Sequence, residues 1–158
     1  MQDNNADVLR LLGPLELMLD GQHVDLGGPK QRALFAYLAL HAGEPVSIDT
    51  LIEAVWGAVA PDGAIRSLRT YVSNLRGLLG SAVEVKGEQG TYRLQFPSVE
   101  TDMDAFRRTV RLATEIEDPH ESSVMLAAAL DLWRGSFLAD VDRPWVQEES
   151  STAASTLS

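Results

Sequence analysis

The sequence predicts an α+β fold in which a small antiparallel sheet, three helices and a β-hairpin precede a purely helical segment. Short apolar segments separated by turn residues occupy residues 8–26 and 82–96, as expected of paired strands. Apolar residues recur at helical spacing between residues 29 and 80 and again between 102 and 135. The order of these patterns along the chain defines the predicted fold.

The first strands are bounded by recognisable turns. Val8–Leu12 is one apolar run that contains a single arginine, and Gly13-Pro14 turns the chain after it. The segment 15–19 alternates imperfectly between polar and apolar residues, and Asp20-Gly21 is a strong hairpin signal. His23–Leu26 alternates again and is predicted to be the returning strand.

The first two helices carry clear end signals. Pro29 suits the first position of a helix, and Gly43 ends the apolar periodicity that follows it. The second helix is predicted over residues 47–57, with Ser47 as its N-cap and Gly57 at its end.

The third predicted helix, residues 62–80, is cleanly amphipathic. At 100° per residue its apolar side chains occupy one arc and its polar side chains the opposite arc. The chain carries 23 Asp and Glu against 13 Lys and Arg, yet no acid occurs between Gly63 and Val83. A solvated face in so acidic a protein would be expected to carry Asp or Glu. The predicted hairpin 82–96 follows this helix.

The second part of the chain is predicted to be helical and more acidic. Helical patterns cover 102–116 and 119–135. The segment 147–158 lacks apolar periodicity and is expected to be disordered, as is the leader 1–7. We therefore expect one domain over 8–97 and the beginning of a second over 101–146.

Three helices followed by a hairpin have the geometry of a helix-turn-helix with a wing. A helix fits the DNA major groove, where Arg can pair with guanine and Asn with adenine. A hairpin beside it can reach the neighbouring backbone or minor groove. From periodicity alone, a solvated surface whose arginines pair locally is about equally compatible with this helix. The absence of acids favours an anion-binding face.

Several segments together resemble the Streptomyces antibiotic regulatory protein family. The resemblance covers about Val8 to Trp145 and includes "LLGPLEL", "GGPKQRALFAYLALHAGEPVSIDTLIEAVWG", "SLRTYVSNLRGLLG", "DMDAFRRTV" and "LADVDRPWV". These are bacterial transcription activators. In them an OmpR-like winged helix precedes a helical, TPR-like bacterial transcriptional activation domain.

The resemblance implies that 62–80 is the recognition helix and 82–96 the wing. It also implies binding as a dimer to direct repeats in promoter DNA, with recruitment of RNA polymerase. The expected DNA-binding residues lie on the first helix, the third helix and the wing: Lys30, Arg32, Arg66, Arg69, Thr70, Ser73, Asn74, Arg76, Lys86, Thr91 and Arg93. At the wing tip, Glu88 would repel phosphate.

An alternative from another class is a protein-interaction module, in which the winged helix is structural and the arginine face docks an acidic protein. We expect no enzyme, because no nucleophile, base and oxyanion site can be assembled. No cofactor or metal is expected either: cysteine is absent and the three histidines lack ligand spacing. No apolar run approaches the ~20 residues of a membrane span. We expect a cytoplasmic protein.

Overall fold

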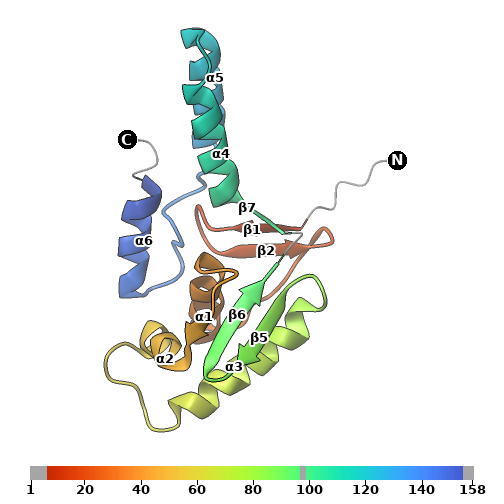
Figure 1. Cartoon of the computed structure of the whole chain (residues 1–158), viewed down its shortest axis with the longest axis vertical. Helices are drawn as coiled ribbons and strands as arrows, with labels where there is room; N and C mark the ends of the chain where they lie inside the picture. The colour runs from red at the N-terminus through yellow and green to blue at the C-terminus, as the bar shows by residue number, and fades with distance from the viewer. Residues whose placement is uncertain (1–6, 97–98, 155–158) are drawn as a thin grey trace.

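The computed structural model describes residues 7–96 and 99–154, and it begins with a small sheet (Figure 1). Strands β1 (Val8–Arg10), β2 (Glu16–Leu19) and β3 (Gln22–His23) form an antiparallel meander. Strand β7 (Glu100–Thr101) pairs in parallel with β1, giving the order β3-β2-β1-β7. The chain that leads into the second part is therefore a strand of the first sheet.

Three helices and a second sheet follow β3. Helices α1 (Pro29–Leu40), α2 (Ile48–Trp56) and α3 (Ala64–Leu79) pack on one another. The second sheet has the order β4-β6-β5 and is antiparallel throughout. Its strands are β4 (Val46–Ser47), β5 (Glu84–Glu88) and β6 (Thr91–Gln95). This is the predicted winged helix-turn-helix.

Local sequence signals set the helix boundaries. The Ser47 hydroxyl accepts a hydrogen bond of 3.1 Å from the Thr50 amide, which makes Ser47 the predicted N-cap of α2. Pro29 occupies the start of α1, as predicted. Apolar side chains of α1, α2, α3, the hairpin and the first sheet belong to one hydrophobic core, so burial fixes the orientation of α3.

The second part of the chain consists of helices α4 (Asp102–Thr114), α5 (Pro119–Leu130) and α6 (Pro144–Ala154). Thr101 caps α4 and Asp118 caps α5 through side-chain hydrogen bonds to backbone amides. Figure 1 shows α4 and α5 side by side and projecting away from the sheets. Among the described residues no helix is long and apolar enough to cross a membrane.

Three predicted boundaries are wrong. The strand predicted at His23–Leu26 is instead the short β3, Gln22–His23. The helix predicted over 119–135 ends at Leu130. Residues 134–139 do not continue it, because their backbone forms hydrogen bonds with the backbone of residues 11–13. The predicted disordered tail is helical as far as Ala154, because Trp145 and Val146 anchor the start of α6 on the core. Residues 1–6 and 155–158 lie outside the described residues.

We call the irregular segment 131–143 the strap. Its backbone amides at Arg134, Leu138 and Ala139 donate to the carbonyls of Leu12, Leu11 and Gly13, respectively. The Arg134 guanidinium also donates to the Pro14 carbonyl at 2.8 Å. The strap therefore holds the second part against the turn between β1 and β2.

A buried carboxylate reinforces the same junction. Asp102, at the start of α4, accepts backbone N–H bonds from Leu11 at 2.7 Å and from Leu12 at 3.1 Å. Burial raises the pKa of Asp102, while these two amides and the nearby Arg134 act in the opposite direction. The carboxylate thus joins α4 to the end of β1.

Candidate nucleic-acid interface

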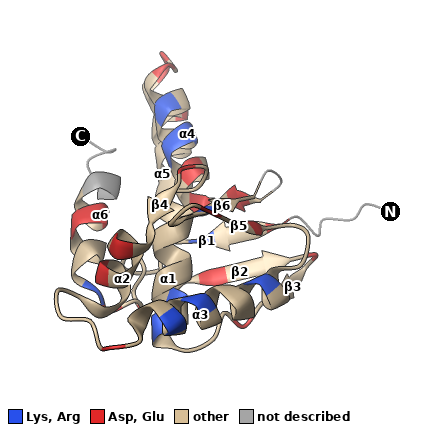
Figure 2. Ribbon diagram, turned by 60° about the horizontal axis from the view of Figure 1, so that its bottom comes forward, with Lys and Arg blue, Asp and Glu red and all other residues tan. Residues whose placement is uncertain are grey.

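Helix α3 presents the acid-free face predicted from the sequence. It begins after Gly63, whose φ of 82° is readily adopted by glycine. The side chains that enter the core are Ala64, Leu68, Val72, Leu75 and Leu79. The side chains of Arg66, Arg69, Thr70 and Ser73 are exposed. Figure 2 shows the basic residues of α3 with no acid among them.

Two guanidiniums on this face have no partner among the residues that the structure describes. Within residues 7–96 and 99–154, neither the Arg66 guanidinium nor the Arg69 guanidinium forms a hydrogen bond or an ion pair with a side chain. Thr70 donates its hydroxyl to the Arg66 carbonyl at 3.1 Å, within the helix. The two arginines can therefore bind an external anion without breaking an internal bond.

Asn74 is exposed but makes a hydrogen bond within the protein. Its amide donates to Gln31 Oε1 at 3.0 Å, and Gln31 Nε2 donates to the Leu26 carbonyl at 2.9 Å. The side chain of Gln31 is buried between them. A Cβ at Gly27 would lie 2.5 Å from Gln31 Nε2, so this relay requires glycine there. The relay fixes α3 against the start of α1.

Arg76 is also exposed and also makes hydrogen bonds within the protein. Its Nε and Nη2 donate to the Val85 carbonyl at 2.9 and 2.7 Å. This fork ties the last turns of α3 to strand β5 of the wing. Tyr71, at the edge of the apolar arc, stacks on Trp56 of α2 with ring centroids 6.0 Å apart. These contacts orient α3 with respect to its neighbours.

The wing carries both signs of charge. Lys86 lies opposite Arg93 in the β5–β6 register, and strand alternation puts Glu84 and Glu88 on the same face as Lys86. Arg93 lies 4.0 Å from Glu88, and the Thr91 hydroxyl donates to the Glu88 carbonyl at 2.8 Å. The wing therefore offers a weaker positive potential than α3.

The two basic residues of α1 lie in different surroundings. Lys30 is exposed, with no bond to any side chain in the part of the chain described. Arg32 donates to the Leu15 carbonyl at 2.8 Å and pairs with the Asp140 carboxylate of the strap. Asp140 also accepts from the Leu15 amide at 2.9 Å. Arg32 thus joins α1 to the junction between the two parts.

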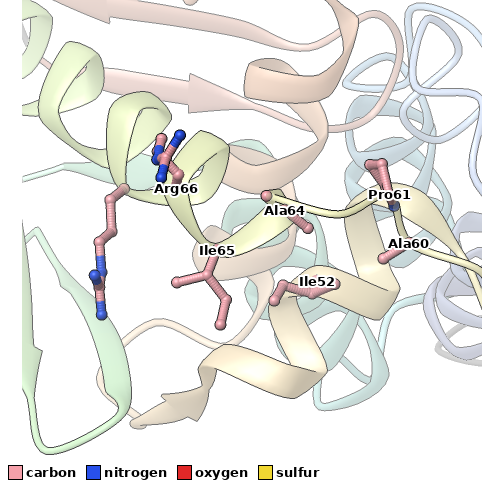
Figure 3. Close-up of a pocket in the computed structure, with 8 residues that line it drawn as sticks. Ile52, Ala60, Pro61, Ala64, Ile65 and Arg66 are labelled. Carbon is pink, nitrogen blue, oxygen red and sulfur yellow. The ribbon is translucent and has the colours of Figure 1, made fainter.

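A hollow adjoins the N-terminal end of α3. Ile52 of α2, Ala60 and Pro61 of the loop, and Ile65 of α3 line it, with Arg66 and Arg69 also contributing. Figure 3 shows Ile52 and Ile65 close together and the Arg66 side chain directed elsewhere. Ile65 is 46% exposed although the sequence pattern assigned it to the buried arc. The apolar face of α3 is therefore partly exposed to solvent at the N-terminal end of the helix.

Two residues outside the predicted DNA-binding set hold α2 in place. The indole of Trp145 donates to the Ala54 carbonyl at 3.0 Å, and Arg143 Nε donates to the Val55 carbonyl at 2.8 Å. Both carbonyls belong to the last turn of α2, where helical partners are lacking. These two contacts could not be predicted from the sequence, because their partners lie about ninety residues apart.

The fold and the exposed basic helix define a winged-helix protein with an attached helical domain. Two family descriptions match the chain: "Transcriptional regulatory protein, C terminal" over residues 21–90 and "Bacterial transcriptional activator domain" over residues 101–156. The chain belongs to the Streptomyces antibiotic regulatory protein family of transcriptional regulators. This confirms the resemblance seen in the sequence.

Curated relatives share this arrangement. The chain is 40% identical over 139 residues to transcriptional regulatory protein EmbR of Mycobacterium tuberculosis, covering 83% of this chain and 36% of the relative. It is 37% identical over 156 residues to regulatory protein AfsR of Streptomyces coelicolor, covering 94% of this chain and 15% of the relative. The chain therefore spans about a third or less of these two proteins.

A solved structure confirms the fold. The structure described as Mycobacterium tuberculosis EmbR in complex with a low-affinity phosphopeptide superimposes with a TM-score of 0.82 at 34% identity. The superposition covers 96% of this chain and 42% of the other. The family and its named relatives are transcriptional regulators rather than enzymes.

Proposed function

We propose that this chain is a sequence-specific double-stranded DNA-binding regulator that activates bacterial transcription. The exposed, acid-free face of α3 carries the proposal, because its two unpaired guanidiniums lie on the helix that a winged-helix protein inserts into the major groove. Arg66 and Arg69 are assigned to DNA, and exposed Thr70 and Ser73 are suited to phosphates or base edges.

The remaining expected DNA-binding residues divide into two groups. Lys30, Lys86, Thr91 and Arg93 are assigned to flanking phosphates, with the wing weakened by its acids. Arg32, Asn74 and Arg76 are assigned mainly to holding the framework, since each donates hydrogen bonds within the protein. A bond to DNA from any of these three would have to replace or supplement an internal one.

We further propose binding as a dimer to direct repeats in promoter DNA and recruitment of RNA polymerase, both in the bacterial cytoplasm. The family membership supports this proposal. The loop between α2 and α3 adds an apolar surface suited to a protein contact, because Val59 is 88% exposed and directly precedes Ala60, which lines the Ile52–Ile65 hollow.

Selection of bound duplexes from a random DNA pool tests the proposal. We expect enrichment of a direct repeat whose spacing is a whole helical turn, because both copies would then lie on one face of DNA. The double variant Arg66→Ala/Arg69→Ala should yield no enriched sequence. An Arg111→Ala variant, which changes an exposed arginine of α4, should retain the enrichment.

The alternative is a protein-interaction module whose arginine face docks an acidic protein. It predicts that the pool yields no enriched sequence with the unaltered chain. Salt dependence would not separate the two functions, since both rely on charge. Enrichment by the unaltered chain and its loss in the α3 double variant would exclude this alternative as the main function of the face.

A further inference from the structure

A hollow of about 370 Å³ lies where α6 begins, against α1 and the C-terminal end of α2. Tyr37 of α1 and Trp145 of α6 both line it. Their ring centroids are 5.1 Å apart at an interplanar angle of 81°, an edge-to-face arrangement. Because Trp145 also bonds the Ala54 carbonyl, its ring is held in place before any ligand arrives.

The charged side chains that line this hollow are carboxylates. Glu53 comes from α2 and Glu148 from α6. Burial raises the pKa of the Tyr37 hydroxyl, and the charges of Glu149, Glu53 and Glu148 raise it further. Glu53 and Glu148 thus line the same hollow as the aromatic pair.

The end of α2 adds to the negative potential. Gly57 and Ala58, which follow the last turn of α2, also line the hollow, and the C-terminus of a helix favours cations. Arg143 is the neighbouring cation, and its guanidinium donates to the Val55 and Asp142 carbonyls. Arg143 does not line the hollow, but its charge partly offsets the negative potential of this helix end, so the attraction for a cation rests mainly on the aromatic pair and the carboxylates.

We propose that this hollow binds an organic cation, either an alkylammonium or a guanidinium. The faces of Trp and Tyr rings attract such cations through the ring quadrupole, and the exposed carboxylate of Glu53 supplies a counter-charge. Carboxylates alone would also attract hydrated metal ions, but an aromatic wall selects for weakly hydrated organic ones. No residue of α3 lines this hollow, so the site is separate from the exposed basic face of α3.

Titration of the chain with choline at constant ionic strength tests the proposal. The indole N–H resonance of Trp145, assigned by its absence in Trp145→Phe, should shift and saturate. The neutral alcohol 3,3-dimethyl-1-butanol has nearly the shape of choline without the charge and should produce no saturable shift. An equal response to both compounds would overturn the proposal, because binding would then not depend on the positive charge.

Two variants and one matched control locate the binding. Glu53→Gln should weaken choline binding about two- to fivefold, as expected for one partly exposed ion pair. Glu44→Gln removes an exposed carboxylate outside the hollow and should leave the affinity unchanged. Tyr37→Leu should weaken binding about two- to thirtyfold. If Tyr37→Leu is unfolded, the comparison of Glu53→Gln with Glu44→Gln decides, and equal affinities in that pair contradict the site.

The cation could be a free small molecule or a basic side chain of another polypeptide. Parallel titrations with choline, N-acetyl-lysine amide and N-acetyl-arginine amide distinguish these sources. Tighter binding of choline indicates a free ammonium ligand, whereas tighter binding of either amide indicates a polypeptide side chain. Failure of all three to bind overturns the proposal while leaving the DNA-binding function untouched.

Discussion

The indole Nε1 of Trp145 donates a 3.0 Å hydrogen bond to the carbonyl oxygen of Ala54, ninety-one residues earlier in the chain. The contact joins the first turn of α6 to the last turn of α2. Helix α2 in turn packs its terminal Trp56 on Tyr71 of α3. The helical part of the chain is thus connected, through two contacts, to the helix assigned to DNA.

Trp145→Phe should lower the free energy of unfolding by about 1 kcal/mol more than Trp133→Phe. Both changes remove the same atoms from an edge-to-face aromatic pair. The buried indole N–H of Trp133, however, finds no hydrogen-bond partner among the described residues. Urea denaturation of the two variants measures the difference, and equal losses would mean that the bond to Ala54 contributes no net stability.

Arg69→Ala should weaken binding to the selected DNA by about 1–3 kcal/mol if the guanidinium reads a base. Its folding stability should remain unchanged, because no internal bond is lost. Fluorescence anisotropy gives the affinity and thermal melting gives the stability. Arg111→Ala is the control for a general loss of positive charge, and an equal effect of the two would remove Arg69 from the interface.

Arg76→Ala should behave differently. Loss of the two bonds to Val85 should lower the free energy of unfolding by about 1–3 kcal/mol, since the donor is charged. The slope of log affinity against log salt should stay near that of the unaltered chain, whereas a phosphate contact would reduce it by about 1. A reduced slope with unchanged stability would reassign Arg76 to the DNA backbone.

Glu88→Gln should strengthen DNA binding about two- to fivefold at low salt. The change removes a negative charge beside the phosphates and frees Arg93, which lies 4.0 Å from that carboxylate. Glu117→Gln, an exposed acid between α4 and α5, is the matched control. Salt titrations of both variants check this, and the gain should fade as salt rises. Unchanged affinity in Glu88→Gln would place the wing tip away from DNA.

Asp102 should make stability fall as pH rises above its ordinary pKa of 3.8. Because burial raises the pKa of Asp102, the folded protein holds this proton more tightly than the unfolded chain. Its stabilising contribution is complete below pH 3.8 and is lost as pH rises through the folded pKa. Asp102→Asn lacks this titration, so the unaltered chain should lose stability relative to it across that window. Urea denaturation at several pH values measures the difference, and a constant difference would contradict the raised pKa.

Much of the winged helix could be predicted because its signals are local. Ser47 caps α2 through a residue three positions away, and Gly63 precedes α3 in a conformation that glycine adopts readily. The amphipathic pattern of α3 follows from its own residues. Its acid-free face is also readable in sequence, since it depends only on which side chains are present.

The partners of those side chains could not be predicted in the same way. Arg69 and Arg76 are equivalent in the sequence pattern, yet Arg76 donates to the Val85 carbonyl whereas Arg69 has no partner in the described part of the chain. The predicted end of α5 and the predicted disorder of residues 147–154 were also wrong. The chain after α5 forms backbone hydrogen bonds with residues 11–13, and α6 is anchored on the core. Both sets of partners are distant in sequence.

By itself, the sequence determined the order of the elements, the family and the basic face, because helix periodicity, turns and charge are properties of neighbouring residues. Only the tertiary structure decided which cations remain available to DNA. It also decided that Tyr37, Glu53 and Trp145 would surround one hollow. Hydrogen-bond partners and shared surfaces are set by packing between distant segments, and no local pattern encodes those distances.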